Sequence, residues 1–161
     1  MNPFELIQRE IRYTYDEESW FVPLKQALEG VTAEQAHWRP EGASGNTIYE
    51  TASHLLYYKE RTVRLLKGNE PPKVLESNEA SFTYYPGETE EEWQTIVSSL
   101  EEMSRELAAI VQTKTEKEYN ELFAGKYTTG PAISDIALHD AYHAGQIVFL
   151  RKLQGEWPSQ R

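Results

Sequence analysis

Apolar residues recur at three- and four-residue spacings in four long stretches of this chain, and that spacing predicts amphipathic α-helices. The clearest stretch opens at Thr89 and carries its apolar positions from Trp93 to Val111. The other three cover residues 3–29, 47–67 and 128–153. Strand signals are few. The pattern therefore predicts an all-α protein built as a four-helix bundle.

Cap and breaker residues mark where these helices begin and bend. Thr47 with Glu50, and Thr89 with Glu92, have the spacing of a capping box, in which each side chain bonds the other residue's backbone N–H. Pro131 suits the first turn of the last helix, because the N–H it lacks has no helical partner there. Pro23 lies inside the first stretch and predicts a kink.

The longest gap between the predicted helices covers residues 69–87. It contains four breakers, Pro71, Pro72, Pro86 and Gly87. The run from Ser81 to Tyr85 has the composition of a short extended segment. Gaps of this length are often functional, for example as the cover of a site, and the sequence leaves the role of this one open.

Length and composition limit the classes of protein that fit. A chain of 161 residues suits one domain over residues 1–161. The absence of cysteine excludes disulfides, a cysteine nucleophile and a zinc ribbon. The net charge of −10 opposes binding to nucleic acid. The charged N-terminus does not fit a signal peptide, and no apolar run reaches the roughly 18 residues of a membrane span. We therefore expect a cytoplasmic protein.

Three of the four histidines fall in two of the predicted helices. His139 and His143 are four residues apart, which places both imidazoles on one helix face. His54 lies at the edge of the apolar face of the second helix. Such a set can converge on a metal ion, although a pair at this spacing also arises by chance on solvated helices, and a lone histidine at a core edge often bonds a carbonyl. His37 has no partner at helical spacing and is expected to be structural or exposed.

The chain resembles the DinB/YfiT-like superfamily of small helical-bundle proteins. The resemblance rests on three motifs: Arg39-Pro40-Glu41-Gly42 leading to Thr47-Ile48, then Ala52-Ser53-His54-Leu55, and finally His139-Asp140-Ala141-Tyr142-His143-Ala144-Gly145-Gln146-Ile147. It implies a bundle with a long crossover connection and one metal ion held by His54, His139 and His143. Zinc or nickel is typical of the family, iron is compatible with the ligands, and many relatives are homodimers.

The resemblance also suggests a reaction, because some members use such a centre to transfer low-molecular-weight thiols such as bacillithiol. Three nitrogen ligands leave metal positions open for a small-molecule substrate. Our leading hypothesis is therefore a metal-dependent thiol transferase.

One alternative is a hydrolase with a metal-bound water, for which Glu50, Tyr58 and Asp140 are candidate bases, although each fits a surface charge or a packing tyrosine better. The other alternative is a non-catalytic metal-binding stress module. Gln146 is a candidate to support a ligand or line the pocket.

Overall fold

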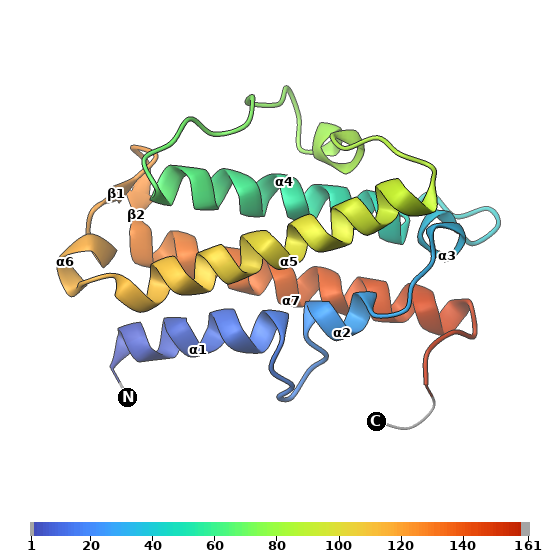
Figure 1. Ribbon diagram of the computed structural model, residues 1–161, viewed down its shortest axis with the longest axis horizontal. Coiled ribbons are helices and arrows are strands. Elements are labelled where there is room, and N and C mark those ends of the chain that lie inside the picture. Colours follow the sequence, from blue (N-terminus) through green and yellow to red (C-terminus); the bar gives the residue numbers. More distant parts are fainter. Residues whose placement is uncertain (1, 159–161) are drawn as a thin grey trace.

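Four long helices lie side by side in the computed structural model, which describes residues 2–158 (Figure 1). They are α1 (Pro3–Tyr15), α4 (Ile48–Leu66), α5 (Glu90–Thr113) and α7 (Thr129–Leu153). Four short helices occupy the connections: α2 (Leu24–Leu28), α3 (Ala33–His37), the 3₁₀ helix η1 (Glu79–Thr83) and α6 (Glu116–Tyr119). The predicted all-α class and four-helix bundle are confirmed.

The second and third long helices along the chain, α4 and α5, run in the same direction. Tyr49 contacts Trp93 near their N-terminal ends, and Lys67 bonds Glu106 further along both helices. Parallel neighbours need a connection that returns along their whole length. Residues 67–89 make that return, passing over the bundle beside α4 (Figure 1). This is the long crossover that the family resemblance implies.

The predicted helix starts are confirmed by their caps. Thr47 and Glu50 form a reciprocal capping box at α4, and Thr89 and Glu92 form one at α5. In each box the threonine side chain accepts from the glutamate N–H, and the glutamate carboxylate accepts from the threonine N–H. Pro131 lies in the first turn of α7, as its missing N–H predicts.

The prediction of one kinked helix over residues 3–29 is wrong. Helix α1 ends at Tyr15, residues 16–23 form an irregular link, and α2 begins after Pro23. Proline disfavours helical backbone in the residue before it, and Pro23 is itself extended, with ψ of 155°. Trp20 lies in the link and is 97% exposed.

Two further segments differ from expectation. Residues 81–85 are not extended, because the 3₁₀ helix η1 occupies most of the run and packs against α4. Between α6 and α7 the chain forms a small antiparallel hairpin of β1 (Leu122–Phe123) and β2 (Tyr127–Thr128). Gly125 in its turn has φ of +71°, a conformation that favours glycine.

The core of the bundle consists of two clusters of buried apolar side chains. One includes Leu55, Trp93 and Ile147, and the other includes Leu107 and Ile133. In the part of the chain that the structure describes, no helix combines the length and apolar character that a membrane crossing requires.

A buried ion pair joins three of the long helices. The Lys59 ammonium on α4 lies 2.6 Å from Oδ2 of Asp140 on α7 and 2.7 Å from Oγ of Ser104 on α5. The side chains of Lys59 and Asp140 are only 1% and 2% exposed. The expectation that Asp140 is a surface charge is therefore wrong: it faces the interior because α4 supplies its countercharge.

We expect Lys59→Met to lower the free energy of unfolding by about 3–5 kcal/mol, because it leaves the Asp140 carboxylate buried without its cation. Lys67→Met, which removes the exposed pair with Glu106, should cost no more than about 1 kcal/mol. Urea unfolding of both variants measures the difference. The double variant Lys59→Met/Asp140→Leu should recover most of the loss, and equal costs for the two single variants would contradict the assignment.

Candidate metal centre

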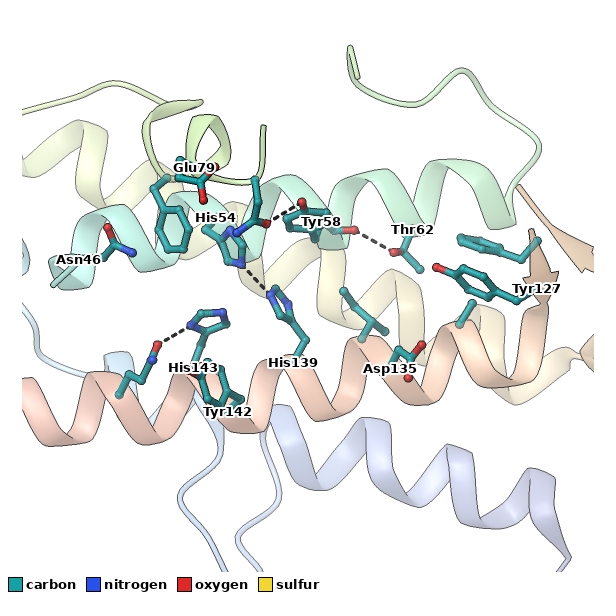
Figure 2. Close-up of a pocket in the computed structure, with 16 residues that line it drawn as sticks. Asn46, His54, Tyr58, Thr62, Glu79, Tyr127, Asp135, His139, Tyr142 and His143 are labelled. Carbon is teal, nitrogen blue, oxygen red and sulfur yellow. Dashed lines mark hydrogen bonds between the residues drawn. The ribbon is translucent and has the colours of Figure 1, made fainter. Parts of the chain in front are cut away.

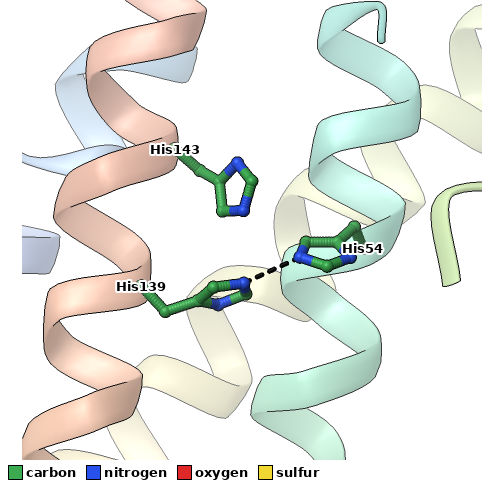
Figure 3. A group of neighbouring side chains, drawn as sticks. All are labelled: His54, His139 and His143. Atoms are coloured by element: carbon green, nitrogen blue, oxygen red, sulfur yellow. Dashed lines mark hydrogen bonds between the residues drawn. The ribbon is translucent and has the colours of Figure 1, made fainter. Parts of the chain in front are cut away.

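Three histidine side chains meet between α4 and α7. His54 projects from α4, and His139 and His143 project from successive turns of α7 toward it (Figure 3). Their ligand nitrogens all lie within 4.8 Å of one another, and Nε2 of His54 is 2.7 Å from Nε2 of His139. The structure thus brings together the three histidines that the helical spacing singled out. His37 lies elsewhere, exposed and stacked on Tyr49.

Burial keeps this group largely away from water. His54 and His143 are 3% and 5% exposed, and His139 is half-buried. Phe82, from η1 in the crossover, stacks on the His54 ring with 4.1 Å between ring centroids. The 3₁₀ helix η1 of the crossover therefore lies against the histidines.

The same burial holds all three imidazoles uncharged at neutral pH. Burial, together with the charge that His143 would carry, lowers the pKa of His54 to about 4. Burial, together with repulsion from His143, His54 and Lys59, lowers the pKa of His139 to about 3. Burial lowers the pKa of His143, against a hydrogen bond to Gln146 that raises it. Neutral imidazoles are the form that binds metal ions.

Hydrogen bonds orient two of the rings. Ser81 donates its hydroxyl hydrogen to the Asn78 carbonyl, so its Oγ, 2.6 Å from Nδ1 of His54, accepts from that nitrogen. Oε1 of Gln146 lies 2.7 Å from Nδ1 of His143 and can only accept (Figure 2). Both histidines therefore carry their hydrogen on Nδ1, and each leaves the Nε2 lone pair free.

His139 has a different environment. Its Nδ1 is buried and has no hydrogen-bond partner. Because Nε2 of His54 is an acceptor, Nε2 of His139 donates the hydrogen that lies between them. A cation at this point would replace that hydrogen and receive lone pairs from all three rings. The donor set fits zinc, nickel or iron, all of which accept imidazole nitrogen.

A cavity of about 720 Å³ opens beside the three imidazoles (Figure 2). Tyr58 and Gln146 line it, as expected of pocket residues, and the Tyr58 hydroxyl donates to Asn78. Glu50, one of the candidate bases, does not line it. Its carboxylate pairs with Arg39 and caps α4, because its place in the capping box turns it toward the helix N-terminus.

The sequence reasoning missed the contribution of the crossover to the site. Ser81 is fully buried and holds His54, while Phe82 covers the same ring. No metal-ligand spacing points to either residue. The only available signal was an aromatic cluster, Phe82-Thr83-Tyr84-Tyr85, inside an otherwise polar segment.

The model of the DinB superfamily matches residues 23–147, a range that contains all three histidines, Ser81 and Gln146. No curated protein matches the chain.

We expect Gln146→Leu to weaken the affinity for zinc about 10-fold or more, because Nδ1 of His143 loses the acceptor that orients its ring. Competition with a chromophoric chelator measures the dissociation constant. Gln112→Leu, an exposed position on α5, is the matched control and should bind like the wild type. An unchanged zinc affinity in Gln146→Leu would show that the hydrogen bond does not support the ligand.

We expect the metal-free protein to lose stability as the pH falls from 6.5 toward 4. Unfolded histidines take up protons below about pH 6.5, whereas folded His54 and His139 stay neutral down to about pH 4 and 3. The free energy of unfolding should therefore fall by about 1.4 kcal/mol per pH unit for each such histidine.

Urea unfolding at a series of pH values tests this slope. His139→Phe should flatten it by the contribution of one histidine, whereas His37→Ala, at the exposed position, should leave the contribution of the buried histidines intact. Parallel profiles for the wild type and His139→Phe would contradict the expectation.

Proposed function

This chain belongs to the DinB superfamily, and on that premise we propose that it binds one divalent metal ion through His54, His139 and His143 and uses it to activate a small thiol for transfer. The observation that carries the proposal is the convergence of three uncharged imidazoles at the wall of a substrate-sized cavity. A buried group of this kind, in which Nε2 of His54 and Nε2 of His139 lie 2.7 Å apart, is suited to receive a cation.

A divalent ion held by His54, His139 and His143 would lower the pKa of a bound thiol and so supply a nucleophilic sulfur. The thiol comes from a co-substrate, because the chain contains no cysteine. Ser81 and Gln146 hold the imidazoles in place, and Phe82 shields His54 from water. In transfer to a chlorinated aromatic, the sulfur forms the bond to carbon, chloride leaves with the electron pair of the broken bond, and the thiol proton passes to solvent.

Hydrolysis is supported less well, because it needs a base beside the reacting water. Glu50 is engaged by Arg39 away from the cavity, and Asp140 is buried in its pair with Lys59. Tyr58 lines the cavity, but burial raises the pKa of its hydroxyl, which opposes action as a base. A purely structural metal site is supported less well too, because a structural site needs no adjoining cavity of this size.

We expect protein purified without a polyhistidine tag to contain about one equivalent of zinc, nickel or iron per chain by elemental analysis. His54→Ala and His143→Ala should lose it, since each removes one of three ligands. His37→Ala is the matched control, because it removes an exposed histidine outside the cluster and should keep the metal.

Turnover is measured with the metal-loaded protein, a small thiol and 1-chloro-2,4-dinitrobenzene. The wild type and His37→Ala should form the thioether, and His143→Ala should fall to the uncatalysed rate. Wild-type turnover by His143→Ala would rule out the metal as activator. Hydrolysis of an ester panel without any thiol would favour the hydrolase instead.

A further inference from the structure

The cavity beside the histidines is elongated. It follows the groove between α4 and α7 from Asn46 at one end, past the imidazoles, to Phe123 and Tyr127 of the hairpin (Figure 2). Its volume of about 720 Å³ is much larger than a metal ion requires and suits a small organic molecule. A substrate held at the imidazoles therefore has room to extend toward the hairpin.

The formal charges along this cavity are all negative. Its lining includes no lysine or arginine, and its only charged side chains are the carboxylates of Glu79 and Asp135. Among the described residues neither carboxylate forms a salt bridge. Two cations of the adjoining stretch of α4 act on the wall from outside the lining: Lys59 is bonded to Asp140, and Arg61 lowers the pKa of the Tyr58 hydroxyl against the effect of burial.

Asp135 is the acidic group best placed to contact a substrate. It precedes His139 by four residues on α7, so it lies about one helical turn, about 6 Å along the axis, from that ligand and on the same face. Figure 2 shows it on the hairpin side of the imidazoles, where the cavity continues. A group attached two or three bonds from a sulfur at the histidines would approach this carboxylate.

Aromatic rings form much of the remaining wall. They are Tyr58, Phe82, Phe123, Tyr127 and Tyr142. The faces of such rings attract cations and pack well against apolar groups, but they offer little to an anion. The ring centroids of Phe123 and Tyr127 are 6.0 Å apart, so they form one continuous surface at the hairpin end.

We infer that this cavity selects its thiol by charge, accepting one whose remainder is neutral or carries an ammonium group and discriminating against one that carries a carboxylate or phosphate. The inference rests on the proposed function, because it places the sulfur at the three histidines. Asp135 is the residue that determines the preference, and the net charge of −10 on the chain acts in the same direction over longer distances.

The test uses the cobalt-substituted protein, in which bound thiolate gives a charge-transfer absorption band. Dissociation constants are measured for cysteamine, 2-mercaptoethanol and 3-mercaptopropionate, which are similar in size and differ in charge. Because these thiols also differ in their own acidity, the readout is how the ratio of their dissociation constants changes between the wild type and each variant.

Asp135→Asn should reduce the preference for cysteamine over 3-mercaptopropionate about 3- to 10-fold, the effect of one nearby charge on two oppositely charged ligands. Asp135→Lys should shift it further in the same direction. Glu102→Gln is the matched control, an exposed acid on α5 outside the cavity lining, and should leave the ratio unchanged. Asp135 is exposed and unpaired, so circular dichroism should show both of its variants folded.

An unchanged ratio in both Asp135 variants overturns the inference while thiol binding at the centre stands. A wild-type protein in which no thiol produces the charge-transfer band overturns the proposed function, and this inference with it.

Discussion

The buried pair of Lys59 and Asp140 fixes how α7 is rotated against its neighbours. Successive residues of a helix point about 100° apart, so the direction of Asp140 determines the direction of His139 beside it. When Asp140 faces Lys59 and Ser104 in the interior, His139 and His143 face His54 across the groove. A desolvated ion pair contributes little net stability compared with apolar packing. It does strongly disfavour any rotation that would separate the two charges, and the alignment of the histidines depends on that restriction.

Burial has two linked effects on the histidines. It holds all three in the neutral form, and the Lys59 ammonium adds to this effect at His139. Neutral rings can share a hydrogen, as His54 and His139 do, but one nitrogen of His139 then has no partner. Without a cation the three rings carry no charge, and Nδ1 of His139 forms no hydrogen bond. Protons bind these rings weakly, because the pKa of each is lowered. A doubly charged ion that accepts several lone pairs suits the three rings better.

Patterns of a few neighbouring residues correctly predicted the features that depend only on those residues. The capping boxes at Thr47 and Thr89 marked two helix starts correctly, because a cap is completed within four residues. The spacing of His139 and His143 placed both on one face for the same reason. Contacts between distant segments were not predictable in this way. The burial of Asp140 depends on Lys59, 81 positions away, and the role of Ser81 depends on a crossover that returns to α4. The link at residues 16–23 was missed because apolar spacing continued through it by coincidence.

The crossover divides the site between two kinds of scaffold. The metal-ligand candidates stand on α4 and α7, whose inner faces are locked into the packed interior, while Phe82 and Ser81 belong to a connection between helices. Insertions and exchanges in the exposed parts of such a connection, outside η1, disturb few interior contacts. Members of this family can therefore diverge in the crossover and in the helices separately. A change in the crossover alters the shape of the cavity entrance, and so the molecules that fit it, while the three candidate metal ligands stay the same.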